Sequence, residues 1–352
     1  MIFLILFTSF FITLVVLPRL SDMAPKIGLM DLPHKRKIHM KPKPLVGGLG
    51  IFTAFLVCSL LLTSFSNLQG FYAGLLLLII IGFFDDLKGL APRWKFLVQI
   101  LAAILLIFFN KTVLISVGNI LFLGPIHLGI FAIPVTIFCI VGVINAINMI
   151  DGIDGLAGGI SFISLVSFAV LSYLNQQKEL MIISTVLSGA VIGFLRYNWY
   201  PSKLFMGDIG SNSLGFTMAF LSIALSQKGK YSVSPMVPVL ILAVPIVDTL
   251  TVMIKRKLRN ESPFRAGKDH IHHVLLRMGF DKKTTVTVIL SVSFLFSLLG
   301  IFGTFLKIPD YYLFLIFCTY FIFYFSSSFY VKEIYTYRMK LTRRIRIAKC
   351  NK

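Results

Sequence analysis

The stretch NAINMIDGIDGLAGG, residues 145–159, decides how the rest of the chain is interpreted. It joins two apolar runs, 130–147 and 157–175, yet it contains two asparagines, two aspartates and four glycines. Charged side chains are costly inside a hydrocarbon layer, and where they occur they usually mark a functional site. The pattern indicates a membrane protein that holds polar chemistry where two membrane-spanning segments meet.

The composition of the whole chain favours the same class. The 352 residues are 57% hydrophobic, and the apolar residues, which include 34 Phe, fall in long blocks. A helix of about 20 residues crosses the hydrocarbon core of a bilayer. Eleven segments near that length lie between polar breaks, at 2–18, 46–66, 69–84, 94–110, 130–147, 157–175, 180–196, 212–226, 235–254, 285–306 and 311–330.

We therefore predict an all-α, polytopic membrane protein with eleven transmembrane helices. Residues 1–330 form the membrane domain, and residues 331–352 form a basic cytoplasmic tail. Lys and Arg are retained on the cytoplasmic side of membranes. With the N-terminus outside and the C-terminus cytoplasmic, 29 of the 34 Lys and Arg fall on the cytoplasmic side, many of them in a substrate-binding arm at 255–284. The net charge of +20 then reflects topology and contact with anionic lipids, and nucleic-acid binding is not expected.

Eleven of the 14 Asp and Glu fall on the same predicted side, although they played no part in the orientation. In GFFDDLKGL, residues 82–90, Asp85 and Asp86 end an apolar run. Adjacent carboxylates repel each other there unless a cation lies nearby. A hydrated helix end is the plain alternative for this pair.

The opening stretch and one further motif extend the acidic set. Glycines would let the backbone turn after residue 150 and bring together Asn145, Asn148, Asp151 and Asp154, although an ordinary interhelical loop is the alternative. In LFMGDIGSNSLGF, residues 204–216, Asp208 lies between two glycines, and free amides at a helix start would suit a phosphate or its metal. Such oxygen-rich clusters favour Mg²⁺ or Mn²⁺ bound to a diphosphate substrate.

A basic set accompanies the acidic one. The arm motif ESPFRAGKDHIHHVLLRMGF, residues 261–280, favours an anion-binding segment; a zinc site and a solvated loop are the alternatives, and zinc is disfavoured because no cysteine lies near. The first cytoplasmic loop adds further lysines, most of which suit a membrane anchor. Asp248 lies inside a predicted span, where it is either functional or a helix-packing hydrogen-bond partner.

Four motifs in this order resemble those of the polyprenyl-phosphate N-acetylhexosamine-1-phosphate transferases, which are glycosyltransferases of family 4. They are GFFDDLKGL, NAINMIDGIDGLAGG, FMGDIGSNSLGF and AGKDHIHHVLLR. Within the family, HIHH at 270–273 is similar to the undecaprenyl-phosphate GlcNAc-1-phosphate transferases, whereas the phospho-MurNAc-pentapeptide transferases carry three consecutive histidines there. Gly89 stands where the fuller Asp-Asp-x-x-Asp form has a third acid, which weakens any role for a third carboxylate.

The resemblance implies Mg²⁺-dependent transfer of N-acetylglucosamine-1-phosphate from UDP-GlcNAc to undecaprenyl phosphate, with release of UMP. This would be the first membrane step of a cell-envelope polysaccharide pathway such as lipopolysaccharide, O-antigen or teichoic acid synthesis. It implies a multi-pass protein of the bacterial inner membrane with its active site on the cytoplasmic face, and it leaves room for a homodimer. Transfer of another UDP-N-acetylhexosamine, or phospho-MurNAc-pentapeptide transfer, is the nearest alternative.

The resemblance, together with the residue chemistry, gives each motif an expected role. We expect Asp208 and Asp151 to hold the metal, and Asp85 or Asp86 to position the acceptor or accept its proton, with Asp154 counted among the catalytic residues. The expected substrate-binding residues are Asn148, Asp154, Arg265, His270, His272, His273 and Lys37.

Direct attack by the lipid phosphate and a two-step path through a phosphorylated aspartate both fit these motifs; we favour direct attack. A secondary transporter is the hypothesis of another class, since intramembrane Asp and Gly-rich broken helices also serve ion coupling. It is disfavoured because the acidic residues gather at one predicted face and no internal repeat is visible.

Overall fold

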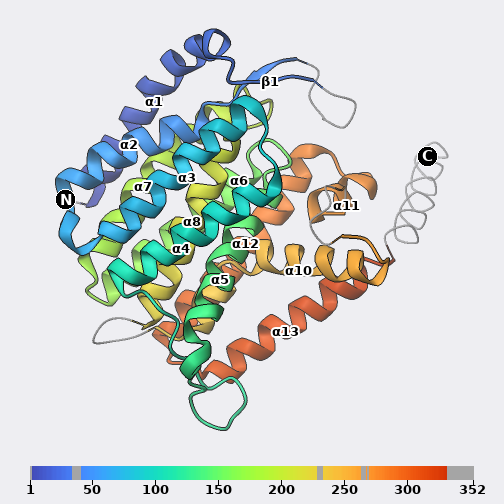
Figure 1. Ribbon diagram of the computed structural model, residues 1–352. Coiled ribbons are helices and arrows are strands. Elements are labelled where there is room, and N and C mark those ends of the chain that lie inside the picture. The colour runs from blue at the N-terminus through green and yellow to red at the C-terminus, as the bar shows by residue number, and fades with distance from the viewer. Residues whose placement is uncertain (1, 34–40, 228–232, 263–266, 268, 331–352) are drawn as a thin grey trace, which may run out of the picture.

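The computed structural model describes residues 2–33, 41–227, 233–262, 267 and 269–330 as a bundle of helices (Figure 1). The longer helices are α1 (Ile2–Ile27), α2 (Gly47–Leu62), α3 (Gln69–Lys88), α4 (Pro92–Asn110), α5 (Ala132–Ile150), α6 (Leu156–Leu174), α7 (Lys178–Asn198), α8 (Gly207–Gln227), α10 (Ala243–Leu258), α12 (Lys282–Phe305) and α13 (Asp310–Ser327). The short elements are the helices α9 (Met236–Ile241) and α11 (Ile271–Arg277), two 3-10 turns (Phe65–Asn67 and Gly129–Phe131), and a small antiparallel ribbon of β1 (Met30–Asp31) and β2 (Lys43–Pro44).

Within the described residues, nine helices are long and apolar enough to cross a membrane. The all-α, polytopic class predicted from the sequence is therefore confirmed. Helix α2 is apolar but has only 16 residues. The orientation across the membrane and the total number of crossings stay predictions.

The predicted span at 235–254 is divided between α9 and α10. Pro245 explains the break, because it has no N–H to donate to the carbonyl of Ile241. The two pieces still run between the two ends of the bundle. Pro235 lies beside Gly118 and Asp310 at one end, and Lys255 Nζ donates to the carbonyl of Ser328, 2.9 Å away, at the other. Helices α9 and α10 together thus run in the same direction as α13.

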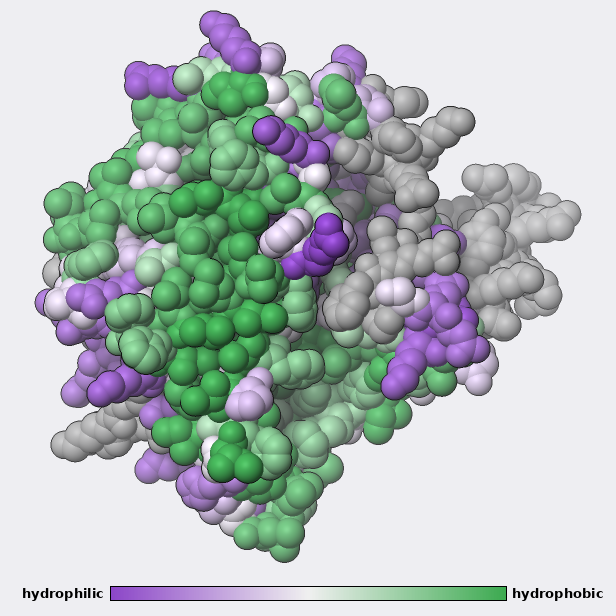
Figure 2. Space-filling view, viewed as in Figure 1, coloured by the Kyte–Doolittle hydropathy of each residue, from purple (hydrophilic) through white to green (hydrophobic). Residues whose placement is uncertain are grey.

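Helix α8 lies at the centre of the bundle, and its residues are almost entirely buried. It packs against α2, α3 and α5, while α6 and α7 pack against each other beside it. The outer helices expose apolar side chains. On α4 these recur at helical spacing as Leu97, Leu101, Ile104 and Phe108. Figure 2 shows a broad hydrophobic face across the bundle with hydrophilic residues toward its margins, as expected for a surface that faces lipid.

The two ends of the bundle differ. At one end, Asn67 Nδ2 donates to Glu179 Oε1 at 2.9 Å, and the backbone amide of Phe71 donates to Asn110 Oδ1 at 2.9 Å, beside a small cavity of about 290 Å³. At the other end lie the last turns of α3, α5 and α7 and the first turns of α4, α6, α8 and α12. This second end carries the polar motifs of the sequence.

Candidate active site

A cavity of about 1190 Å³ opens among these helix ends. It is lined by residues of α3, α5, α8, α11 and α12, by the small ribbon, and by the segments 151–154 and 198–205. Its charged, histidine and amide side chains are Asp31, Lys41, Lys43, Asp85, Asp86, Asn148, Asp151, Asp154, Asn198, Asp208, His273 and Lys282. The three acidic motifs of the sequence therefore share one cavity.

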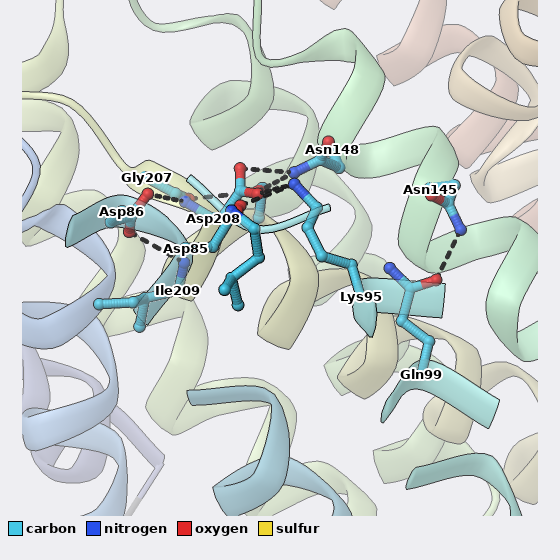
Figure 3. Close-up of polar contacts among 11 residues, drawn as sticks. Asp85, Asp86, Lys95, Gln99, Asn145, Asn148, Gly207, Asp208 and Ile209 are labelled. Atoms are coloured by element: carbon cyan, nitrogen blue, oxygen red, sulfur yellow. Dashed lines mark hydrogen bonds and ion pairs between the residues drawn. The ribbon is translucent and has the colours of Figure 1, made fainter. Parts of the chain in front are cut away.

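Lys95 bridges two of the aspartates (Figure 3). Its Nζ lies 2.6 Å from Asp85 Oδ2 and 2.5 Å from Asp208 Oδ2. The cation that the paired carboxylates require is thus supplied by the chain itself. Lys95 was not predicted as a site residue, because a lysine at the start of the apolar run 94–110 is typical of an interfacial anchor.

Asp86 has a different task from its neighbour. Its carboxylate accepts hydrogen bonds from the backbone amides of Asp208 (2.9 Å) and Ile209 (3.3 Å), in the first turn of α8. A carboxylate at this place satisfies unpaired amides and opposes the positive end of the helix dipole. Gly207 makes the approach possible, since its φ is +72° and a Cβ there would lie 2.5 Å from Asp86 Oδ2. Two of the amides that we expected to be free for a phosphate are therefore occupied.

Asn148 joins α5 to the start of α8. Its Nδ2 lies 3.0 Å from Asp208 Oδ1 and 2.8 Å from Ser211 Oγ. Asn145, one turn earlier, does not line the cavity with the rest of its motif, because its Nδ2 donates to Gln99 Oε1 at 2.8 Å (Figure 3). The expectation that all four polar residues of the motif meet is wrong for Asn145, which pairs α5 with α4 instead.

Asp151 follows the last residue of α5 and lies deep in the cavity. Burial, reinforced by the negative charges of Asp208 and Asp154, raises the pKa of its carboxyl to about 7. No donor in the described part of the chain hydrogen-bonds this carboxylate. It is therefore the carboxylate of the cavity that is best prepared to take a cation.

Asp154 lines the same cavity but has its own contacts. Its Oδ2 accepts from the backbone amide of Ser202 at 3.0 Å and lies 3.7 Å from Lys43 Nζ. Lys43 also donates to Ser202 Oγ at 2.6 Å, and its ammonium lies 4.6 Å from the centre of the Phe205 ring. Lys37, the residue of this loop that we expected to bind substrate, lies outside the described residues, as do Arg265 and the tail 331–352. Two other lysines of the loop, Lys41 and Lys43, line the cavity.

The three histidines of the arm do not act alike. His270 and His272 are buried, and only His273 lines the cavity. Within the described residues, neither ring nitrogen of His272 has a hydrogen-bond partner. Burial, and after it the neighbouring His273, lowers the pKa of His272 to about 3, so this ring is neutral at physiological pH. The ring packs directly on Gly152, where any side chain would collide with it.

The oxygen donors of the cavity fit a Mg²⁺ ion in chemical type. No three His, Cys, Asp or Glu side chains among the described residues form a ready-made cage. Mg²⁺ does not require one, since it commonly uses one or two carboxylates together with water and substrate phosphates. Asp151 and Asp208 both face the cavity and would be those two carboxylates.

The fold and the cavity define a polytopic membrane protein with an acidic, lysine-bridged site at one end of its helical bundle. Residues 68–226 match the model of Glycosyl transferase family 4. A probable undecaprenyl-phosphate N-acetylglucosaminyl 1-phosphate transferase of Bacillus subtilis is 36% identical over 298 residues, which cover 83% of this chain and 82% of the relative.

Two further relatives are named undecaprenyl-phosphate alpha-N-acetylglucosaminyl 1-phosphate transferase. That of Haemophilus influenzae is 30% identical over 344 residues and 96% of both chains, and that of Escherichia coli K12 is 28% identical over 308 residues, or 86% of this chain and 82% of the relative. The chain belongs to glycosyl transferase family 4. The resemblance seen in the four motifs is thereby confirmed.

Proposed function

We propose that the protein transfers N-acetylglucosamine-1-phosphate from UDP-N-acetylglucosamine to undecaprenyl phosphate. The products are UMP and undecaprenyl-diphosphate-N-acetylglucosamine. The observation that carries the proposal is the gathering of Asp85, Asp151, Asp154 and Asp208 in one cavity at one end of a membrane bundle. The names of the relatives support the same donor and acceptor.

The acceptor needs little activation. A phosphate monoester has a second pKa near 6, so the lipid phosphate is largely dianionic at pH 7. One of its oxygens attacks the phosphorus that carries the sugar, and the bond from that phosphorus to the bridging oxygen of UMP breaks. No protein nucleophile is required, and catalysis consists mainly of positioning and charge neutralisation.

The cavity residues suit this division of labour. Asp151 and Asp208 would hold Mg²⁺, which would neutralise charge on the diphosphate when bound. Asp86 caps the amides of α8, whereas Asp85 accepts from the backbone amide of Leu90 at 2.6 Å and pairs with Lys95. Of the two, Asp85 would orient the acceptor, together with Lys95. Lys95 holds Asp85 and Asp208 at a fixed separation.

The donor would bind on the other side of the cavity. Asp154, Lys43 and the Phe205 ring form a polar and aromatic surface there, and His273 adds a group able to contact donor phosphate or sugar. A polyprenol gains about 0.8 kcal/mol for each buried CH₂, so its chain stays in the bilayer while its phosphate reaches the cavity. We infer that the cavity faces the cytoplasm of a bacterial cell, at the inner membrane, where it begins a cell-envelope polysaccharide.

The test uses purified protein in detergent with undecaprenyl phosphate and a panel of UDP-N-acetylhexosamines, with UMP release as the measurement. We expect release from UDP-N-acetylglucosamine that requires both the lipid and Mg²⁺ and stops with EDTA. Absence of UMP from every donor, in protein shown to be folded, would contradict the proposal. Labelled phosphate that remains on the protein when acceptor is omitted would instead favour the two-step path.

A further inference from the structure

We propose that Asp248 is a positioning residue, which fixes helix α11 so that His273 faces the donor side of the cavity. The proposal rests on the proposed function for the identity of the donor. Asp248 itself does not line the cavity and touches none of the residues expected to hold metal or acceptor.

Asp248 lies on α10 with 1% of its surface exposed, and its carboxylate receives three hydrogen bonds from two other helices. Oδ1 accepts from the backbone amide of Ile271 at 2.7 Å and from the hydroxyl of Tyr324 at 2.8 Å. Oδ2 lies 2.8 Å from Nδ1 of His270. One carboxylate thus joins α10, the first residue of α11 and the last turns of α13.

The cost of burying the Asp248 carboxylate favours the one arrangement in which all three donors reach it. A buried carboxylate is very costly unless donors surround it, and here three donors meet it. Helix α11 has only seven residues, too few to hold a fixed structure without tertiary contacts. Its rotation and depth are therefore determined by what anchors it, and Asp248 anchors both the backbone and the side chain at its start.

The anchored helix then presents its histidines in a fixed arrangement. His270 points to Asp248, and His272 packs on Gly152 beneath the turn that carries Asp151. The next residue, His273, lies on the cavity side, with its ring 4.3 Å from that of His272. If α11 rotated or withdrew, His273 would leave the cavity. A carboxylate outside the cavity thereby determines which histidine can meet the donor.

The test removes one donor of the junction without exposing an unpaired charge. In Tyr324→Phe, Asp248 keeps the donors on Ile271 and His270. The matched control is Tyr320→Phe, one turn earlier on α13; the Tyr320 hydroxyl makes no hydrogen bond within the described residues, and its ring packs on Phe296. Both variants are compared by hydrogen exchange of the peptide 271–277 and by binding of UDP.

We expect exchange in 271–277 to become about tenfold faster in Tyr324→Phe, the change that corresponds to one lost hydrogen bond of ordinary strength, and to be unchanged in Tyr320→Phe. We also expect weaker UDP binding and a higher KM for the donor, with a smaller change in kcat. Equal hydrogen-exchange rates of 271–277 in the two variants would show that the hydrogen bonds of Asp248 do not stabilise α11. Faster exchange in Tyr324→Phe with unchanged UDP affinity and unchanged donor KM would show that Asp248 has no role in donor recognition.

These results are distinguishable from a failure of the proposed function. The exchange measurement needs no substrate, and UDP binding needs no turnover. A wild-type protein that releases no UMP from UDP-N-acetylglucosamine would refute the proposed donor while leaving the exchange result intact.

Discussion

The cavity has two walls that are built in different ways. We call the side formed by α3, α5 and α8 the aspartate wall. Its carboxylates Asp85, Asp86 and Asp208 belong to long helices that pack against one another, and Lys95 of α4, Asn148 and the amides of α8 hold them. The opposite side, α11, is a seven-residue helix held at its start by Asp248. Asp85 and Asp208 are thus on long, packed helices, while the group expected to recognise the donor, His273, is on a short one. Changes in the aspartate wall should therefore reduce kcat, and changes in α11 should mainly raise the donor KM.

The largest effect is expected for Asp208→Asn. The variant loses a metal ligand and the carboxylate that meets both Lys95 and Asn148, so kcat should fall by about 10²- to 10³-fold, with a smaller change in donor KM. Steady-state UMP release measures this. The control is Asp310→Asn at the opposite end of the bundle, where the carboxylate accepts from the amide of Asn119. An equal loss in both variants would show that the effect comes from folding.

A smaller loss, about 10²-fold in kcat, is expected for Lys95→Met. Without the ammonium, Asp85 and Asp208 face each other with no cation of the chain between them, and the melting temperature should also fall. Lys88→Met provides the control, because Lys88 is an exposed lysine in the last turn of α3. If Lys95→Met kept its activity, the contacts of Lys95 with Asp85 and Asp208 would not be required for catalysis.

Asp151 lies between α5 and Gly152, the residue that His272 of α11 contacts. We predict that metal binding depends on pH through the carboxyl group of Asp151. Its pKa of about 7 means that the carboxyl is protonated below pH 7 and must lose its proton to bind a cation. Affinity for Mg²⁺ should therefore weaken by about tenfold from pH 8 to pH 6, because the deprotonated fraction falls by about that factor. Thermal shifts recorded during Mg²⁺ titrations at each pH measure it. Asp151→Asn should remove the dependence, and a pH-dependent affinity that persists in that variant would assign the proton to another group.

The smallest effect is expected for His273→Ala. Loss of one hydrogen bond to the donor should raise its KM by about fivefold, while kcat changes less. The experiment compares donor and acceptor KM in the same preparation, so that a general loss of active protein is visible. A large fall in kcat with donor KM unchanged would break the distinction between the two walls and would move His273 to the reacting centre.

The sequence was sufficient for the parts of this site in which chemistry restricts the residue type. Asp151, Asp154 and Asp208 each adjoin a glycine near the end of an apolar run, and Asp85 is half of an acidic pair that ends such a run; an ordinary loop rarely needs either combination. Lys95 could not be separated from a membrane anchor, because its partners Asp85 and Asp208 are brought to it only by the packing of α3 and α8 against α4 and its neighbours.

The arm and the broken span were less predictable for related reasons. Three histidines within four residues look equivalent in the sequence, and which of them reaches the cavity depends on Asp248, 22 residues from His270. Apolar composition continues across 235–254, and its three prolines, Pro235, Pro238 and Pro245, do not show by themselves where the helix stops, since proline also occurs within helix α1 without ending it. Long-range contacts determine both features.

The contact between His272 and Gly152 limits the chimaeras that could be used to change donor specificity. An arm transplanted from another family member would bring its own side chain to position 272, and that side chain must fit against a turn with no room for a Cβ. The arm and the turn at 151–155 should therefore be exchanged together, so that both come from the same parent protein in any chimaera.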